Sequence, residues 1–149
     1  MADVTTMAPP DTAALAARLR LGVTRLARRL RQEAEPGITP SMLAALSSVE
    51  LHGPLTMSEL CSVEQVQPPS MTRIVAALVD AGLVTRTVDE SDRRIARVEI
   101  APAGRRLLER ARRRKEVYLA KALRELEPAE LAALEDAAAV LERLTERRP

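Results

Sequence analysis

Apolar side chains recur every three or four residues along much of this chain, and that spacing gathers them on one face of an α-helix. The first such stripe consists of Leu15, Leu19, Val23, Leu26 and Leu30. Asp11 or Thr12 offers a side chain that can cap the start of this helix, and Pro36-Gly37 marks its end. The pattern therefore predicts a long amphipathic helix at the start of the chain.

Two shorter helices follow, and each begins at a recognisable cap. Thr39 followed by Pro40 predicts an N-cap and a proline at the first helical position, with the helix extending to residues 52–53. The next helix opens with a capping box, in which Thr56 and Glu59 satisfy each other's backbone amides. This short helix is predicted to stop near residues 64–65.

A third helix, after a short turn, carries small residues on its outer side. Gln67 is its expected cap, Pro68 occupies the first position, and Gly82 is the expected left-handed stop after Ala81. The side chains predicted to face the core are Met71, Ile74, Val75 and Leu78. Those predicted to face outward are Pro69, Arg73, Ala76, Ala77 and Asp80. A face of small residues can approach a DNA groove closely, because large side chains would hold the backbone away from the base edges.

The pattern then changes from helical to alternating and back. Residues 83–88 and 95–100 are rich in β-branched side chains and flank six polar residues, which predicts a hairpin with a charged tip. Pro102 opens a long helix over residues 103–126, and Glu127-Pro128 separates it from a last amphipathic helix. The predicted fold is mainly α with a small β-hairpin: a winged helix-turn-helix lobe plus N- and C-terminal helices. Such a lobe places one helix in a DNA major groove and a β-loop beside it.

The composition is compatible with one helical domain and an anionic partner. The 149 residues are 46% apolar, which leaves room for one real core, and Tyr118 is the only aromatic residue, so that core must be aliphatic. The formal net charge is +2 and the pI about 9.2, but residues 103–124 are rich in Arg and Lys whereas residues 125–146 are rich in acids. This distribution suits a polyanion such as nucleic acid.

Several classes of function lack the residues that they need. No stretch is long and apolar enough to span a bilayer, and residues 1–11 do not resemble a signal peptide, so we expect a cytoplasmic protein without a membrane partner. One cysteine, Cys61, and one histidine, His52, are too few for a disulfide or a structural zinc site. No nucleophile–base pair or Gly-rich phosphate loop occurs. We therefore expect no enzymatic activity, no cofactor and no metal.

A further set of motifs is spread over most of the chain in a fixed order. They are Leu60-Cys61, residues 70–73 (SMTR), Leu78, residues 82–84 (GLV), residues 92–94 (DRR), residues 98–100 (VEI) and Gly104. Together they resemble the MarR family of bacterial transcription regulators, and the sharpest of them is the Asp-x-Arg motif of the wing. Two positions depart from the usual pattern: Gln65 replaces a turn glycine, and Ala101 replaces the threonine that caps the helix after the wing.

The resemblance implies a homodimeric regulator, most often a repressor, that binds double-stranded, pseudo-palindromic operator DNA. Residues 38–102 would form the DNA-binding lobe, residues 11–36 and 103–149 the helical dimerisation region, and residues 1–10 a flexible N-terminus. The resemblance also implies a cleft between lobe and dimerisation helices, where a small lipophilic or phenolic effector changes the lobe spacing. Two alternatives stay open: a winged-helix protein-interaction module and a non-specific architectural DNA binder.

Candidate DNA contacts lie at the start of the helix over residues 67–81. Arg73 can reach a guanine edge or a phosphate, and the alternative is a solvated arginine paired with Asp80. We favour DNA contact because the surrounding face is small and uncharged up to Asp80. The other candidates on this helix are Gln67, Pro69, Ser70 and Thr72. Helix N-termini attract phosphate, although plain capping is the alternative role for these side chains.

Asp92, Arg93 and Arg94 form the predicted wing tip. The resemblance implies that Arg94 enters a minor groove while Asp92 holds its guanidinium in place, and a narrow A·T-rich groove would reward such an arginine. The alternative is an exposed ion pair of little consequence. We expect Arg93 and Arg97 to meet phosphates or solvent.

Two remaining features have ordinary structural explanations. Cys61 falls where the family usually has a small core residue, so we expect an inert buried thiol rather than a redox sensor. The basic run at residues 112–115 is expected to pair with the acids of residues 125–146. Arg105 and Arg106, which lie nearer the wing, are the better phosphate candidates.

Overall fold

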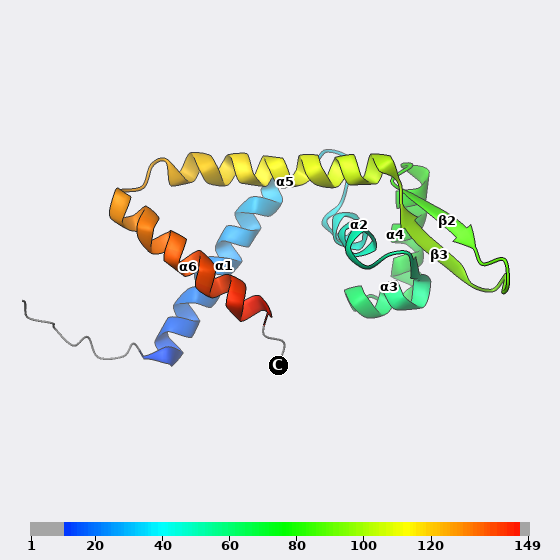
Figure 1. Ribbon diagram of the computed structural model, residues 1–149, viewed down its shortest axis with the longest axis horizontal. Coiled ribbons are helices and arrows are strands. Elements are labelled where there is room, and N and C mark those ends of the chain that lie inside the picture. The colour runs from blue at the N-terminus through cyan, green and yellow to red at the C-terminus, as the bar shows by residue number, and fades with distance from the viewer. Residues whose placement is uncertain (1–10, 147–149) are drawn as a thin grey trace, which may run out of the picture.

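The computed structural model describes residues 11–146 and contains six helices and three short strands (Figure 1). In chain order they are α1 (Thr12–Gln32), α2 (Pro40–His52), β1 (Leu55–Thr56), α3 (Met57–Glu64), α4 (Pro68–Asp80), β2 (Val84–Val88), β3 (Ala96–Ile100), α5 (Pro102–Leu123) and α6 (Pro128–Glu146). The expected mainly helical fold with a winged helix-turn-helix is confirmed. The expectation for residues 1–10 lies outside the described residues.

The elements form two parts that α5 joins. α2, α3, α4 and the three strands pack together at one end of α5, and we refer to residues 38–102 as the lobe. From there α5 extends away to its far end, where the chain turns back into α6, and α1 approaches the middle of α5 (Figure 1). We refer to α1 and α6 as the outer helices.

The helix starts follow the caps that the sequence predicts. The Asp11 carboxylate accepts a hydrogen bond from the Ala13 amide of α1 at 3.0 Å. The Thr39 hydroxyl accepts one from the Met42 amide of α2 at 3.2 Å. The capping box of α3 is complete, because the Thr56 amide donates to the Glu59 carboxylate at 2.7 Å and the Glu59 amide donates to the Thr56 hydroxyl at 3.2 Å. These bonds satisfy amides that a helix start otherwise leaves without partners.

Aliphatic side chains from every element of the lobe fill a single core. The side chains with no exposed surface are Ala45, Leu46, Leu60, Met71, Leu78 and Val98. The first turns of α5 add Leu107 and Leu108 to the same cluster. Gly104 permits this packing, because a Cβ at that position would lie 2.2 Å from the backbone oxygen of Leu83. The start of α5 is therefore anchored in the lobe.

Two details of the chain path differ from the sequence-based expectation. α1 ends at Gln32, before the expected stop at Pro36-Gly37. The strand β1 was not predicted: it pairs antiparallel with β3, with Leu55 opposite Val98, and gives a three-stranded sheet of order β1-β3-β2. Two residues are too few to show an alternating pattern, so only the pairing with β3 reveals this strand.

The turn between α3 and α4 depends on a residue in the left-handed conformation. Gln65 caps α3 with φ 53° and ψ 44°, a region that costs a non-glycine residue about 1–2 kcal/mol. The turn thus keeps the geometry suited to glycine although the side chain is glutamine. Gly82 takes φ 69° after α4, as predicted.

Within residues 11–146, the outer helices have no buried residue. Their large apolar side chains stay open, for example Leu19 at 41% and Leu141 at 39% of full exposure. The amphipathic character predicted for α1 and α6 is present, but their apolar faces have no cover. Throughout the part of the chain that the structure describes, no helix combines the length and the apolar character needed to cross a membrane.

The basic run of α5 does not pair with α6, so that expectation is wrong. Arg112 forms an ion pair with Glu50 of α2, and Arg114 Nε lies 3.0 Å from Glu35 Oε2 in the segment before α2. The reason is position along the helix. These arginines lie where α2 and the segment between α1 and α2 meet α5, whereas α6 begins beyond the far end of α5 (Figure 1).

Candidate nucleic-acid interface

α4 buries one face and leaves the other open, as its periodicity predicts. The buried side chains are Met71, Val75 and Leu78, and Ile74 is half-buried. The exposed residues of the outer face are Pro69, Arg73, Ala76 and Asp80. Ala77 was expected on this outer face but is half-buried against the core, because it lies at the border of the two faces. The open surface is therefore narrower than predicted.

The first turn of α4 presents polar groups to solvent. Gln67 occupies the N-cap position but makes no capping hydrogen bond through its side chain, so the capping role suggested for that side chain is wrong. The Thr72 hydroxyl donates to the Pro68 carbonyl at 2.9 Å, within the helix itself. Pro69 and Ser70 are exposed. The first two helical residues are prolines without an N–H, and the amides of Ser70 and Met71 both donate to the Gln67 carbonyl at 3.0 Å, so this turn presents side chains rather than free backbone amides to a partner.

Arg73 stands on the exposed face of α4 without a carboxylate partner among residues 11–146. The alternative of an ion pair with Asp80 is not realised. An unpaired guanidinium keeps all its donors available for a phosphate or a base edge. Its position supports the expectation from sequence without testing the contact itself.

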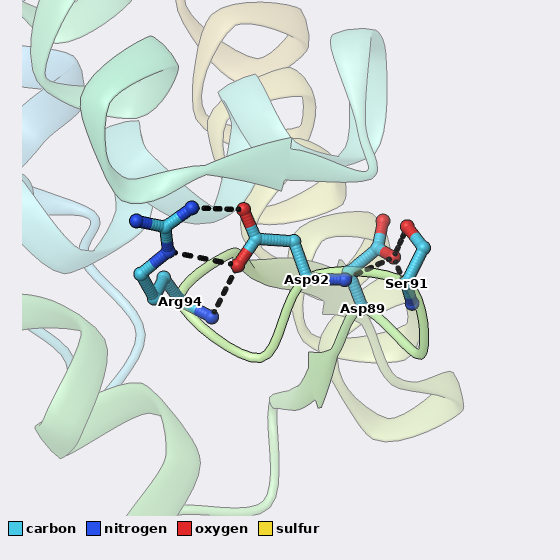
Figure 2. Close-up of polar contacts among 4 residues, drawn as sticks. All are labelled: Asp89, Ser91, Asp92 and Arg94. Atoms are coloured by element: carbon cyan, nitrogen blue, oxygen red, sulfur yellow. Dashed lines mark hydrogen bonds and ion pairs between the residues drawn. The ribbon is translucent and has the colours of Figure 1, made fainter.

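The wing holds Arg94 in a defined orientation through Asp92. The Arg94 guanidinium donates to both carboxylate oxygens of Asp92, from Nε to Oδ1 and from Nη2 to Oδ2, each at 3.1 Å, and the Arg94 amide donates to Oδ1 at 3.0 Å (Figure 2). The Arg94 side chain, followed by its amide, lowers the pKa of the Asp92 carboxyl, and the Asp92 carboxylate in turn raises the pKa of Arg94. The Arg94 side chain is nevertheless 90% exposed. It is oriented and still open to a partner.

A second aspartate shapes the other half of the wing loop. Asp89 Oδ1 accepts from the Ser91 hydroxyl at 2.5 Å, from the Ser91 amide at 2.8 Å and from the Asp92 amide at 3.3 Å (Figure 2). The Ser91 hydroxyl is the largest cause of the lowered pKa of Asp89. This set of bonds organises the loop locally before any partner arrives. No role was predicted for Asp89, although its spacing before Ser91 is typical of an aspartate turn.

The other wing arginines divide between solvent and the lobe. Arg93 is exposed, as expected. Arg97 is half-buried, and its Nη1 lies 4.0 Å from Glu59 Oε2 on α3, so its expected encounter with phosphate or solvent competes with a carboxylate of its own chain. This contact ties β3 to the capping box of α3.

Arg86 on β2 is a basic residue that the sequence analysis missed. It lines a hollow of about 550 Å³ with Pro68 and Thr72 of α4, and a second hollow of about 490 Å³ with Arg94 and Arg97 of the wing. Arg86 therefore connects the start of α4 with the wing. A signal was present, because Arg86 shares one face of β2 with Val84 and Val88, where the alternation of the strand leads one to expect an apolar residue.

Cys61 packs against the core but is only half-buried, so it is less buried than expected, and its expected inertness stays a prediction. One side of it lines the hollow beneath α4. Among residues 11–146, no group of three or more His, Cys, Asp or Glu side chains is placed to hold a metal ion. This side of the lobe gathers guanidinium cations and hydrogen-bond donors beside the Asp80 carboxylate, and guanidinium groups of this kind can bind phosphates and base edges.

Comparisons with known proteins point in the same direction. The sequence model described as the MarR family matches residues 38–96, which is most of the lobe. An HTH-type transcriptional regulator of Mycobacterium bovis is 36% identical over 138 residues, covering 92% of this chain and 96% of that protein.

Solved structures extend the match to the whole architecture. A crystal structure of a transcriptional regulator protein from Pseudomonas aeruginosa superposes with a TM-score of 0.79 at 34% identity, covering 94% of this chain and 100% of that one. A MepR mutant of S. aureus bound to an oligodeoxyribonucleotide superposes with a TM-score of 0.69 at 18% identity, covering 89% of this chain and 96% of that one, a likeness of fold alone.

Proposed function

This chain belongs to the MarR family of helix-turn-helix transcriptional regulators, and from that premise we propose that it is a homodimeric repressor of pseudo-palindromic operator DNA. The lobe would read one half-site, and residues 11–36 and 103–149 would form the dimerisation region. The observation that carries the proposal is the wing arginine, because Arg94 is held by both oxygens of Asp92 and remains 90% exposed.

α4 would enter the major groove and the wing would follow the adjacent backbone. Arg73 would contact a base edge or a phosphate, while Gln67, Pro69, Ser70 and Thr72 would line the approach of the helix start to the DNA. Arg94, oriented by Asp92, would insert into the minor groove, and Arg93 would meet a phosphate. The MepR mutant with the same fold is bound to an oligodeoxyribonucleotide, which supports this use of the lobe.

The homodimer is supported by the exposed stripes of the outer helices. Leu15, Leu19 and Leu26 on α1 and Leu131, Leu134 and Leu141 on α6 all have more than a third of their surface exposed. Apolar faces of this extent mark association surfaces in soluble proteins. A second copy supplies matching faces with two-fold symmetry, which is the symmetry of a pseudo-palindromic operator.

A small lipophilic or phenolic effector would relieve repression by changing the separation of the two lobes. A hollow of about 730 Å³ lies between the end of α1 and α5. Val117 and Tyr118 give it an apolar wall, Arg114 and Lys121 give it cations, and Glu33 and Glu125 give it carboxylates. These groups suit a ligand with an apolar body and a polar group such as a phenolic hydroxyl.

Substitution of the two arginines tests the proposal. Arg94→Ala or Arg73→Ala should weaken operator binding about 30- to 10⁴-fold in a fluorescence-anisotropy titration, since each lost contact costs about 1–3 kcal/mol and the dimer has two copies. Arg113→Ala is the matched control, because Arg113 pairs with Glu109 on its own helix at 2.9 Å. Wild-type affinity in both lobe variants would overturn the proposal.

The same titration separates the remaining alternatives. Equal affinity of the wild-type chain for operator and random duplexes would identify a non-specific architectural binder. Failure to bind either duplex, with the chain folded, would favour a winged-helix module that binds protein. The exposed and oriented Arg94 favours the operator-binding regulator over both.

A further inference from the structure

The segment between α1 and α2 is held against α5 by a single carboxylate. Only 11% of the Glu35 side chain is exposed. Its Oε1 accepts from Arg110 Nε at 3.0 Å, and its Oε2 lies 3.0 Å from Arg114 Nε. Arg114 also donates to the Ala34 carbonyl at 3.5 Å. One carboxylate thus joins two arginines that are one helical turn apart on α5, and we call this group the Glu35 clamp.

Glu35 differs from the other acids that pair with α5. The side chain of Glu50 is 22% exposed, and that of Glu109 is 61% exposed and pairs within its own helix. A carboxylate withdrawn from water depends on its cationic partners, because desolvation penalises an unpaired charge. Glu35 is thus the most buried of these acids, and its Oε2 makes no hydrogen bond, so the nearby Arg114 guanidinium is the charge that compensates this oxygen.

The position of the clamp gives it mechanical importance. The lobe is linked to the rest of the chain by two covalent routes: the start of α5, and residues 33–39 between α1 and α2 (Figure 1). A lobe attached through one helix alone could tilt as that helix bends. A second attachment, fixed to α5 by Glu35, resists that motion, and the adjacent pair between Arg112 and Glu50 fastens α2 itself.

We propose that Glu35 is a positioning residue that fixes the angle between the lobe and the outer helices and so determines which half-site spacing the dimer accepts. This inference rests on the proposed homodimeric operator binding. In a two-fold dimer, the separation of the two reading helices follows from how each lobe is attached. Release of the clamp widens the range of separations without removing any contact with DNA.

The test is a series of duplexes with fixed half-sites and a central spacer that varies by single base pairs. The wild-type dimer should prefer one spacer. Glu35→Gln keeps the shape of the side chain but removes its charge. It should reduce the preference for the best spacer over its neighbours by about 2- to 30-fold, the range seen when mutations alter coupling between distant sites.

Glu109→Gln is the matched control, since it makes the same change of charge on the same helix at a pair that bridges no elements. It should leave the spacer profile unchanged. Arg114→Gln removes the cationic partner of Glu35 and should reduce the spacer preference as Glu35→Gln does. The double variant should reduce that preference little further than either single variant. A wild-type spacer profile in both single variants would overturn the inference.

Amide hydrogen exchange provides a readout that needs no DNA. In Glu35→Gln, the amides of Met42 and Leu43, which donate to Thr39 directly after the clamped segment, should exchange about tenfold faster than in the wild type, because opening of this region no longer requires the clamp to break. Unchanged exchange would overturn the inference whatever the DNA results. A different outcome is that the wild-type chain shows no spacer preference while exchange still rises in Glu35→Gln. The clamp would then be present, but the proposed operator function would be wrong, and so would the role of Glu35 in spacing.

Discussion

The lobe and the outer helices are built from the same aliphatic residue types, but they use them differently. In the lobe, Leu46, Leu60 and Leu78 have no exposed surface, whereas Leu19 and Leu141 on the outer helices keep 41% and 39% of theirs. The lobe buries its apolar side chains within one chain. The outer helices need a partner to bury theirs, and we propose that this partner is a second copy.

This difference assigns separate tasks to the two parts. A lobe whose core is closed by the first turns of α5 can hold α4 and the wing in place without a contribution from the outer helices. Outer helices that rely on a partner can determine how far apart two such lobes lie. Substitutions in the lobe should therefore change contact or stability, and substitutions in the outer helices should change assembly.

The largest expected effect comes from a charge in the apolar stripe of an outer helix. Leu19→Asp combined with Leu141→Asp should convert the dimer into monomers, because carboxylates are costly to bury in an apolar interface. Operator affinity should fall by roughly 10³-fold or more, since binding would depend on a single lobe. Light scattering and a DNA titration measure the two effects.

Ala17→Asp is the control for this experiment, because residue 17 lies on the face of α1 opposite the stripe and receives the same charge. It should leave the dimer intact. A double variant that remains dimeric would contradict the role of the outer helices in dimerisation. A loss of helical content in its circular dichroism spectrum would show that the fold of the lobe depends on the outer helices.

The next effect concerns the core of the lobe. Leu46→Ala should lower the free energy of unfolding by about 2–5 kcal/mol at every protein concentration, because it opens a cavity among fully buried side chains. Leu141→Ala should lower it by an amount that depends on protein concentration, because its partners belong to the other copy. Urea unfolding at two protein concentrations distinguishes the two variants. If the loss of stability depended on protein concentration in the same way in both variants, the distinction between the lobe and the outer helices would be wrong.

A smaller effect is expected in the turn of the helix-turn-helix. Gln65→Gly should raise the free energy of unfolding by about 1 kcal/mol, since glycine adopts φ 53° without the cost that a glutamine side chain incurs. Gln67→Gly is the control, because Gln67 has φ −66° and its replacement by glycine removes no backbone strain. Thermal unfolding measures the stability of both variants against the wild type. A loss of stability in Gln65→Gly would show that the side chain makes a contact worth more than the strain.

The smallest effect is the titration of the wing. Because the Arg94 side chain lowers the pKa of Asp92 below its ordinary value of 3.8, the pair contributes stability above that value, and the contribution is lost as pH falls through the lowered pKa. Arg94→Ala should return the pKa of Asp92 toward 3.8, as followed by the NMR signal of its carboxyl carbon. An identical titration curve in both proteins would show that the pair does not form in solution.

Much of the lobe could be predicted from sequence because its signals are local. The cap at Thr39, the box of Thr56 and Glu59 and the glycine stop after α4 each act within four residues. The pairing of Asp92 with Arg94 is also local, at a separation of two residues. Family resemblance supplied the reason to look for it.

What could not be predicted depends on packing between distant segments. The strand β1 exists because Leu55 meets Val98, and nothing within its two residues announces it. The partners of Arg112 and Arg114 come from residues more than sixty positions earlier in the chain, so the nearer acids of α6 were the wrong choice. Arg86 interrupts the apolar face of its own strand, but its role could not be predicted because the residues beside it belong to α4 and the wing.

The most direct test of the central claim is a selection of bound sequences from random duplex DNA with the full-length chain. Two complete lobes spaced by outer helices should enrich an inverted repeat whose half-sites lie about one helical turn apart. Enrichment of a single half-site would contradict the assignment of spacing to the outer helices. Enrichment of no sequence at all would contradict the account of the lobe as a reader of operator DNA.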